Sequence, residues 1–305
     1  MKYNIFPGTA EKVSAIGLGT WVFGGENWGG ADDDQCVMAF EQAVEQGINF
    51  IDTAAFYSNG RAEELIGSVI RGHRDKLFIA TKCGLVRYEG RLRIELSPYS
   101  VFHECEMSLR RMHCDVIDLF QCHWPDDNTP VELTMEALVK LQKQLKIRHI
   151  GVCNFDSLLL EKAIKVAPVK TLQIHYSLLE RSREENLIPF CIEKGIGVIA
   201  YGPMGGGILT GKYKEPPQLA KSDARSMFYK YYSGKKFEQI QSAVEKLKAL
   251  GHPLNQVALN WVRQQKGVLT VLAGGRTPEQ VALNAAATDW DLTAEELGKI
   301  KQIKF

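Results

Sequence analysis

The sequence predicts a closed (β/α)8 barrel, built as a single domain over residues 1–305. Three observations indicate this α/β fold class. Short apolar runs alternate with amphipathic stretches along most of the chain. The runs are rich in Val, Ile and Leu and almost continuously apolar, which is typical of parallel strands covered on both faces. Eight strand-and-helix pairs also suit a chain of 305 residues, the size of an ordinary barrel.

Eight apolar runs are expected to form the barrel strands. They occupy residues 14–20, 48–53, 76–82, 116–123, 147–154, 169–176, 196–202 and 267–274. A doubly wound sheet is the competing fold, and it usually carries G-x-G-x-x-G after its first strand. The glycine-rich segments here, GLGTW and GPMGGGILTGK, do not fit that pattern. We therefore interpret the long interval between Tyr201 and Val268 as one loop with helices, and not as a second domain.

Helix signals occur between the apolar runs. Asp34 is suited to cap the first helix, and Gly47 lies just past its expected end. Ser97 and Pro98 begin a later helix, and Pro130 begins another. Apolar residues recur at helical spacing within these stretches, so each helix is expected to pack one face against the barrel.

The charge balance bears on the class of partner. The 37 Lys and Arg residues almost cancel the 36 Asp and Glu residues, which leaves a net charge of +1. No broad basic surface is implied, so neither a nucleic acid nor an anionic membrane is expected as a partner. No apolar run reaches the roughly 20 residues that span a bilayer, and the N-terminus lacks the apolar core of a signal peptide. The oligomeric state is left open, a monomer being allowed.

The seven cysteines are scattered, without C-x-x-C spacing. We interpret them as reduced, mostly buried thiols of a cytoplasmic protein. Cys122 and His123 are adjacent in the sequence, but neighbours in a strand point to opposite faces, and the usual zinc-ligand spacing is missing. No metal site is therefore expected.

A barrel gathers its active-site residues at the carboxyl ends of its strands, whatever their separation in sequence. Asp52, Lys82 and His123 stand at three successive strand ends, and Tyr57 follows the first of these strands by a few residues. Four ionisable or polar groups at neighbouring strand ends predict a catalytic cluster. The other strand ends carry Thr20, Trp21, Asn154, Gln173, Tyr201, Gly274 and Gly275.

The four residue types suggest carbonyl reduction. A free Tyr has a pKa near 10 and is a poor acid at neutral pH. A buried ammonium from Lys82 is expected to lower the pKa of Tyr57, and Asp52 is expected to keep that ammonium charged. Tyr57 could then protonate a carbonyl oxygen as negative charge grows there, while His123 orients the same oxygen. Such a site needs a separate source of hydride.

Successive motifs of the chain resemble the aldo-keto reductase superfamily, nearest to its bacterial and potassium-channel-β-like branch. The motifs are IGLGTWVFGG, DTAAFYSNGRAEELIG, TKCG, DVIDLFQCHWPD, IRHIGVCNF, LQIHYSLLER, AYGPMGGGILTGKY and LAGGRTPEQVALN. They cover essentially the whole chain in the family's order. The resemblance implies a (β/α)8 barrel, a nicotinamide dinucleotide cofactor, usually NADP(H), and a small carbonyl substrate. It also implies a catalytic tetrad of Asp52, Tyr57, Lys82 and His123.

The resemblance further implies where the cofactor and substrate bind. At the cofactor it implies Thr20, Trp21, Asp52, Asn154, Gln173, Tyr201, Gly202, Pro203, Met204, Gly205, Gly206, Lys212, Arg225, Gly274, Arg276, Gln280 and Asn284. Around the substrate we expect Trp21, Phe56, Tyr57, His123 and Trp124, an apolar pocket with two polar groups. Trp28 could as easily be a packing residue and is left out of the site, and the segment 229–237 is interpreted as a cofactor or substrate flap.

Some positions depart from the family pattern. Cys153 stands where Ser is common before Asn154, and many members carry a Lys at the position of Gly274 and an Arg at that of Gln280. An NADP preference must then depend on Arg276, Arg225 or Lys212. Two other functions stay open: an NADP(H)-binding regulatory or redox-sensing subunit with slow reductase activity, and a barrel isomerase or lyase that binds only phosphate.

Overall fold

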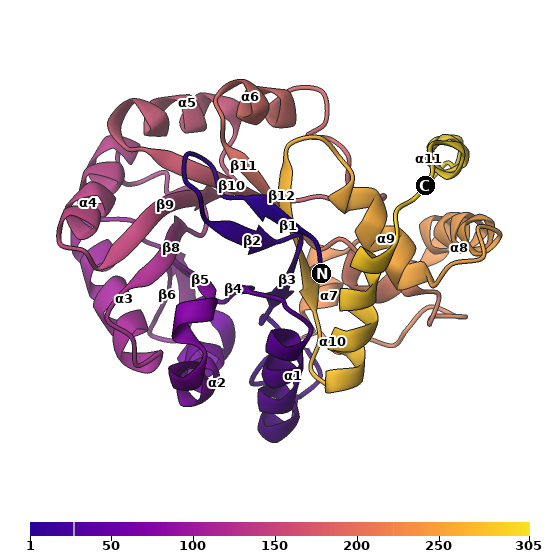
Figure 1. Cartoon of the computed structure of the whole chain (residues 1–305), viewed down its shortest axis with the longest axis horizontal. Helices are drawn as coiled ribbons and strands as arrows, with labels where there is room; N and C mark the ends of the chain where they lie inside the picture. Colours follow the sequence, from indigo (N-terminus) through magenta and orange to yellow (C-terminus); the bar gives the residue numbers. More distant parts are fainter. Residues whose placement is uncertain (27, 222) are drawn as a thin grey trace.

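A closed barrel of eight parallel strands forms the centre of the molecule (Figure 1). The computed structural model describes residues 1–26, 28–221 and 223–305. The strands follow one another around the barrel in chain order, and the ring closes where β12 pairs with β3. They are β3 (Ile16–Gly19), β4 (Phe50–Asp52), β5 (Phe78–Cys83), β8 (Ile117–Cys122), β9 (Ile147–Cys153), β10 (Val169–His175), β11 (Gly197–Tyr201) and β12 (Val268–Gly274). The predicted fold class is confirmed, and each expected apolar run coincides with one of these strands, β5 extending one residue beyond its run.

Helices surround the barrel and pack on the outer faces of the strands (Figure 1). One helix follows each strand: α1 (Asp33–Glu45), α2 (Arg61–Val69), α3 (Pro98–Arg111), α4 (Val131–Lys143), α5 (Ser157–Val166), α6 (Leu187–Glu193), α9 (Leu254–Arg263) and α10 (Pro278–Ala285). The long interval after β11 adds α7 (Ala224–Phe228) and α8 (Gly234–Lys248), and α11 (Ala294–Lys301) ends the chain. The apolar stripes of the sequence therefore cover the barrel, as expected.

The helix starts agree with the sequence except in one detail. Ser97 caps α3 through its side chain, with Pro98 in the first turn, and Pro130 precedes α4. The expected cap at Asp34 is wrong, because Asp32 caps α1 by accepting the N–H of Gln35 at 2.9 Å. Asp32 has the extended backbone that a cap requires, whereas the next two aspartates already lie in the first helical turn.

An N-terminal hairpin fills the end of the barrel where the strands begin. Its strands are β1 (Tyr3–Ile5) and β2 (Lys12–Ser14), which pair antiparallel. Phe6 of its turn is fully buried in a cluster inside the barrel with Phe50 and Phe78, and the Phe6 and Phe78 ring centroids lie 4.7 Å apart. Figure 1 shows the hairpin lying across this end of the ring. The opposite end, where the strands finish, is left for the functional site.

A second hairpin stands beside the open end of the barrel. It consists of β6 (Leu85–Tyr88) and β7 (Arg91–Ile94) and follows directly on β5. Arg87 pairs with Glu26 at 2.7 Å and lies over the ring of Phe56 at 5.1 Å. This hairpin was not predicted, and its contacts connect the loop after β5 with the loops after β3 and β4.

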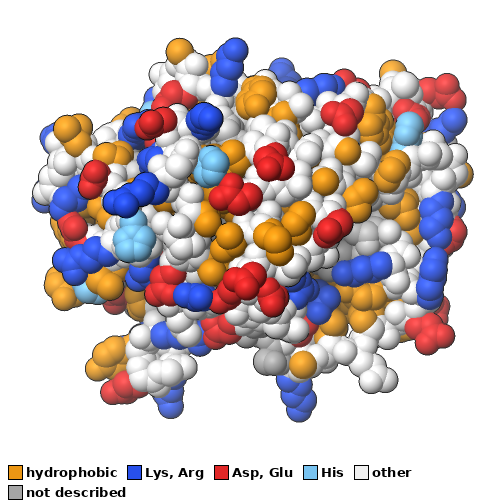
Figure 2. All heavy atoms as spheres, turned by 60° about the horizontal axis from the view of Figure 1, so that its bottom comes forward, with side chains coloured by type: hydrophobic (Ala, Val, Ile, Leu, Met, Phe, Trp, Pro, Cys, Tyr) orange, Lys and Arg blue, Asp and Glu red, His pale blue; other side chains and the backbone are white. Residues whose placement is uncertain are grey.

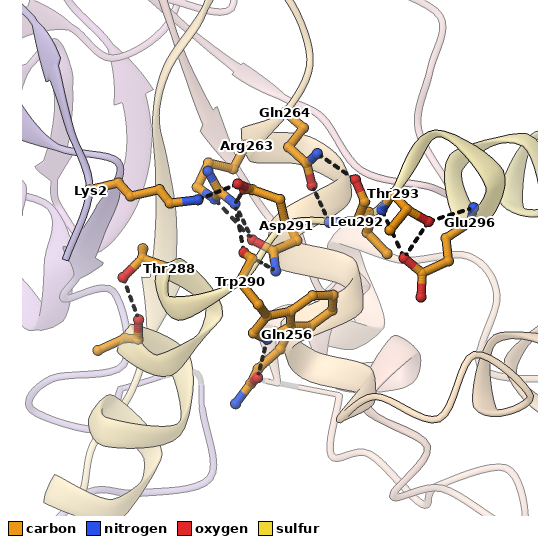
Figure 3. Close-up of polar contacts among 12 residues, drawn as sticks. Lys2, Gln256, Arg263, Gln264, Thr288, Trp290, Asp291, Leu292, Thr293 and Glu296 are labelled. Atoms are coloured by element: carbon orange, nitrogen blue, oxygen red, sulfur yellow. Dashed lines mark hydrogen bonds and ion pairs between the residues drawn. The ribbon is translucent and has the colours of Figure 1, made fainter.

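The C-terminal segment is attached by polar contacts to α9 and to the N-terminus (Figure 3). Gln264 accepts the N–H of Leu292 at 2.8 Å and donates to its carbonyl at 2.9 Å. Trp290 donates from Nε1 to Gln256 at 2.8 Å, and Asp291 bonds both Arg263 and Lys2. The two chain ends are thus held on the same side of the barrel, at a distance from the open end.

Acidic and basic side chains are interspersed on the face of the molecule seen in Figure 2. Among residues 1–26, 28–221 and 223–305, no helix has both the length and the apolarity to cross a membrane. Within these same ranges, no group of three or more His, Cys, Asp or Glu side chains could hold a metal ion.

Gly67 lies where α2 packs closely against the end of α3. A Cβ at Gly67 would come within 2.2 Å of the carbonyl oxygen of Arg111 and 2.9 Å of Met112 Cα, both backbone atoms. We expect Gly67→Ala to lower the free energy of unfolding by about 1–3 kcal/mol, because the two helices must move apart. Urea denaturation measures this difference.

Gly72→Ala is the matched control, since a Cβ at Gly72 would meet no atom within 4 Å. Its stability should stay within about 0.5 kcal/mol of the parent. Equal stability of the two variants would contradict the close packing of α2 on α3.

Candidate active site

A cavity of about 480 Å³ opens among the loops that follow the barrel strands. Most of the residues expected at the site line this cavity. They are Trp21, Asp52, Phe56, Tyr57, His123, Trp124, Asn154, Gln173, Tyr201, Gly202, Pro203, Met204, Gly206, Lys212, Arg225, Gly274, Arg276, Gln280 and Asn284. The structure thus brings together residues from strand ends all around the ring, as a barrel requires.

Three expected residues, Thr20, Lys82 and Gly205, lie near the cavity without lining it. Thr20 is fully buried and donates from its hydroxyl to the carbonyl of Asp52 at 3.0 Å. Lys82 is buried against Tyr57. Gly205 is buried below the cavity wall, and its carbonyl accepts the Tyr232 hydroxyl at 3.1 Å.

Lys82 uses its whole hydrogen-bonding capacity inside the protein. Its ammonium lies 2.7 Å from Asp52 Oδ1, 2.9 Å from the carbonyl of Thr53 and 3.0 Å from the Tyr57 hydroxyl. An ammonium has three donors and no acceptor, so Lys82 must donate to the Tyr57 oxygen. The proton of the Tyr57 hydroxyl is therefore not used in this bond. Because Tyr57 lines the cavity, that proton is available to a bound molecule.

Asp52 keeps the buried ammonium charged. Burial acts to lower the pKa of Lys82, but the Asp52 carboxylate and the other groups around it outweigh this effect and raise the pKa above its usual value. The second oxygen of Asp52 accepts an N–H from Gln173 at 2.8 Å. Neither member of the ion pair is therefore left unsatisfied, which a buried pair needs if it is to persist.

The prediction that Lys82 lowers the pKa of Tyr57 below its usual value is wrong for the protein without a bound molecule. Burial raises the pKa of Tyr57 to about 12, and the nearby Lys82 ammonium offsets only part of that rise. The negative charge of Asp52 raises the pKa of Tyr57 as well, and so offsets part of the lowering by Lys82. The phenol therefore holds its proton at neutral pH until negative charge appears on an adjacent oxygen.

His123 faces Tyr57 across the cavity. Their ring centroids lie 5.8 Å apart with the rings nearly perpendicular. Burial, helped by the Lys82 charge, holds the pKa of His123 well below its usual range. The ring is therefore neutral at physiological pH, and a neutral imidazole still has one N–H to donate. Tyr57 and His123 can both donate a hydrogen bond to one oxygen atom placed between them.

Asn154 and Tyr201 form one side of the cavity. Asn154 adopts a positive φ of 60°, a conformation that Asn tolerates, and it donates to the carbonyl of His123 at 3.1 Å. The Tyr201 hydroxyl donates to Asn154 at 3.0 Å. With Gln173 beside them, two carboxamides and an aromatic face border the same space, a set suited to a flat ring that carries an amide.

The glycine-rich segment after β11 makes a close-fitting wall. Gly202, Gly206 and Gly207 have positive φ and line the cavity. A Cβ at Gly206 would lie 2.5 Å from the Tyr232 hydroxyl, so a larger residue would not fit there. Lys212 lines the same wall and brings a positive charge to it. The N–H groups of Gly205 and Gly207 already donate to the carbonyls of Gly202 and Met204, both at 3.0 Å, so the charge of Lys212, more than a row of glycine N–H groups, makes this wall suited to an anion.

Two basic residues, Arg276 and Arg225, also line the cavity. Arg276 donates to the carbonyl of Trp28 at 3.3 Å, and its backbone N–H is accepted by Gln280 at 3.0 Å. Arg225 forms a two-point pair with Asp223, at 2.8 and 2.6 Å. Carboxamides, a glycine wall and guanidinium groups thus border one cavity, and these are the groups that a nicotinamide dinucleotide would need.

Aromatic side chains border the cavity near Tyr57. Trp21 stacks on Tyr57 with centroids 6.1 Å apart, and Phe56 and Trp124 line the same region. Trp28 and Phe228 also line it, each edge-on to Trp21 at 5.0 and 5.1 Å. Trp28 was left out of the expected site, and the structure places it in the cavity lining. Its loop position carried no periodic signal that could have placed it.

The segment 229–237 supports the cavity wall from behind. The Tyr232 hydroxyl donates to the carbonyl of Gly206 at 2.8 Å, and Tyr229 itself lines the cavity. Phe237 is buried within α8. The segment therefore backs the glycine wall in this structure, where the sequence had suggested a flap.

A family model described as the aldo/keto reductase family matches residues 15–304. The chain belongs to the aldo/keto reductase family. The aldo-keto reductase YhdN of Bacillus subtilis is 36% identical to this chain, and the match covers 99% of this chain and 93% of the relative. The NADH-specific methylglyoxal reductase of Escherichia coli is 32% identical, and the match covers 94% of this chain and 93% of the relative.

Solved structures of other aldo/keto reductases share this fold. The glycerol dehydrogenase AKR11B4 from Gluconobacter oxydans superposes with a TM-score of 0.90 at 35% identity, covering 99% of this chain and 94% of that one. An aldo/keto reductase from Klebsiella pneumoniae in complex with NADP and acetate gives a TM-score of 0.76 at 29% identity, covering 99% and 95% of the two chains. The reductase described here thus has the family's barrel along its full length.

Glu104 of α3 gives this aldo/keto reductase a pH-dependent contact behind the site. It accepts the N–H of Gly84 at 2.8 Å and the Ser100 hydroxyl at 3.1 Å, and burial raises the pKa of Glu104 to about 7. In the unfolded chain a Glu ionises near pH 4.3. The contribution of Glu104 to stability is therefore full below about pH 4.5 and is lost as the pH rises through 7.

We expect Glu104→Gln to flatten this part of the stability profile, because the amide has no proton to lose. Relative to the variant, the parent should lose on the order of 1–3 kcal/mol between about pH 4.5 and 7.5, measured by urea denaturation at several pH values. Glu132→Gln, at an exposed position of α4, is the control and should follow the parent. Parallel profiles for parent and Glu104→Gln would disprove the shifted ionisation.

Proposed function

We propose that this aldo/keto reductase reduces aldehydes or ketones with NADPH and uses Tyr57 as its general acid. One observation carries the proposal. Lys82 donates to Asp52, Thr53 and Tyr57 and has no further donor. The phenol proton is left free on the side of the cavity, and the phenol oxygen lies 3.0 Å from the Lys82 ammonium, whose positive charge stabilises the phenolate.

Each residue of the tetrad has a distinct part. A nicotinamide dinucleotide bound in the cavity would supply hydride to the carbonyl carbon. His123 and Tyr57 hold the carbonyl oxygen through two hydrogen bonds, which stabilise the negative charge that develops there. Tyr57 then gives its proton to that oxygen, and the Lys82 ammonium stabilises the phenolate that remains. Asp52 balances the Lys82 charge when the phenol is neutral.

The substrate end favours an uncharged, largely apolar carbonyl compound. Trp21, Phe56 and Trp124, with Trp28 and Phe228, supply aromatic walls near Tyr57. A mostly apolar pocket with few polar groups orients a small molecule through those groups. The carbonyl oxygen would bond Tyr57 and His123, while the rest of the substrate contacts the rings.

Tyr57→Phe should reduce kcat by about 10²–10⁴-fold, because the general acid is removed while the aromatic ring stays. The dissociation constant for NADPH should change by less than about threefold, since the hydroxyl is assigned to the substrate oxygen and not to the cofactor. Steady-state oxidation of NADPH at 340 nm, with 4-nitrobenzaldehyde as substrate, measures kcat (the wavelength is a property of the cofactor).

Tyr99→Phe removes a hydroxyl from a side chain that is 79% exposed, and it should be fully active. A fully active Tyr57→Phe enzyme would defeat the proposed acid. A parent protein that oxidises bound NADPH once, without turnover, would favour the regulatory or sensing role over an enzyme.

The preference for NADPH over NADH is proposed to depend on Arg276. Arg276 lines the cavity together with Gln280 and Asn284, which carry no charge. A phosphate on the ribose needs a cation there, and a planar guanidinium binds phosphate well. The Klebsiella relative was solved with NADP, whereas the Escherichia relative is described as NADH-specific, so this part of the proposal needs its own test.

Arg276→Ala should weaken NADPH binding by about 10-fold or more, because a charge-assisted bond to phosphate is lost. NADH binding should change by less than about threefold. Fluorescence titration with each dinucleotide measures both constants, and Arg71→Ala, at an exposed position remote in sequence from Arg276, serves as the control. Equal losses for the two dinucleotides, or a parent that prefers NADH, would contradict the assignment to Arg276.

A reducing compartment such as the cytoplasm is proposed as the location. All seven cysteines are free thiols, and six of them are buried. Such thiols persist in a reducing environment.

A further inference from the structure

His175 lies at the carboxyl end of β10 and has no part in the tetrad. It is the register partner of Tyr201 on β11, and the two rings are stacked, with centroids 5.3 Å apart and planes at 15°. Tyr229 meets the imidazole edge-on at 5.6 Å. The imidazole is therefore held between two aromatic side chains, both of which line the cavity.

The stack fixes the ring of Tyr201 from behind. Tyr201 lines the cavity, whereas His175 is not among the residues that line it. The Tyr201 hydroxyl is held by Asn154 at 3.0 Å. One bond at the hydroxyl alone would let the ring rotate about its long axis, and the flat imidazole behind it prevents that rotation. The exposed face of Tyr201 is the face expected to meet the nicotinamide.

The same imidazole supports the start of the glycine wall. A Cβ at Gly202 would lie 2.8 Å from His175 Cδ2 and 2.9 Å from its Nε2. Gly202 has a φ of 68° and directly follows Tyr201. The His175 side chain thus lies behind two successive residues that are expected to contact the cofactor, Tyr201 and Gly202.

Packing, and not hydrogen bonding, holds the imidazole in place. Its Nε2 is buried and has no hydrogen-bond partner among the residues that the structure describes. Burial lowers the pKa of His175, with a partial opposing effect of the Glu180 carboxylate, so the ring is uncharged at neutral pH. The contacts of His175 with Tyr201, Tyr229 and Gly202 suit a flat, neutral ring of this size.

We propose that His175 is a positioning residue that sets the plane of Tyr201 and the start of the glycine wall, and so determines affinity for the nicotinamide dinucleotide. The inference rests on the proposed function, since it assigns the stack to cofactor binding. The proposal concerns the binding of the dinucleotide, and this affinity can be measured without turnover.

Binding of NADPH to the purified full-length protein, followed by the fluorescence of the reduced nicotinamide, tests the proposal. His175→Ala removes the stack and should raise the dissociation constant by about 3- to 10-fold, the range that aromatic pairs provide. His175→Phe restores a flat ring and should return the constant to within about twofold of the parent. His175→Leu fills a similar volume without a flat ring and should behave like His175→Ala, so the comparison of Phe with Leu remains decisive if the Ala variant does not fold.

His149→Ala is the matched control at the other end of the barrel. His149 stacks on Phe78 with planes at 8° and centroids 5.9 Å apart, and it also packs on Phe6. Its removal should lower thermal stability and leave NADPH binding unchanged. With saturating NADPH, the KM for the aldehyde substrate should stay within about twofold of the parent value in His175→Ala, because His175 is not part of the cavity lining.

The outcomes separate the inference from the function on which it rests. Equal binding by His175→Phe and His175→Leu, or unchanged binding by His175→Ala, overturns the positioning role while the reductase assignment stands. Loss of binding in His149→Ala to the same degree also overturns it, because the effect would then follow from general stability. A parent protein that binds no nicotinamide dinucleotide overturns both.

Discussion

The ion pair between Lys82 and Asp52 is the interaction on which the rest of the site depends. Both groups are almost fully buried, and removing one partner of such a pair typically costs about 3–5 kcal/mol. The pair is sustained because Thr53 and Tyr57 accept the remaining ammonium donors and Gln173 donates to the carboxylate. These contacts join the ends of β4, β5 and β10, so the closed barrel is what makes the charge tolerable, and the charge in turn orients Tyr57.

Burial and charge act against each other at the phenol. The Lys82 ammonium favours the phenolate, but the loss of water around Tyr57 is the larger effect and raises the pKa of its hydroxyl to about 12. A phenol of this kind keeps its proton while the site is at rest. It releases the proton only to a strong base formed beside it, which agrees with the role of late-acting acid proposed for it. Neutral His123 complements it, because a second positive charge would compete with Lys82.

Much of this arrangement could be predicted from the sequence, because a barrel's topology brings its strand ends together however far apart they lie in the chain. Asp52, Lys82 and His123 were recognisable as strand-end residues, and their proximity follows from strand pairing. The pKa of Tyr57 could not be derived in the same way, since a sequence gives neighbours but not the degree of burial. Trp28 lies in a loop, for which no periodicity exists, and the stack of His175 on Tyr201 depends on the register between β10 and β11, which the sequence does not give. The hairpin β6–β7 was missed because its strands are only four residues long and mostly exposed, and the alternation of Arg and apolar residues in β7 is too short to stand out.

The N-terminal hairpin has a consequence for how small molecules enter and leave the barrel. Because Phe6 and its neighbours fill the end of the barrel where the strands begin, in the described part of the chain the Tyr57 hydroxyl is reached from the other end. In the proposed reaction, cofactor and substrate therefore enter and leave through the same opening, and the molecule that is covered by the other has to bind first and leave last.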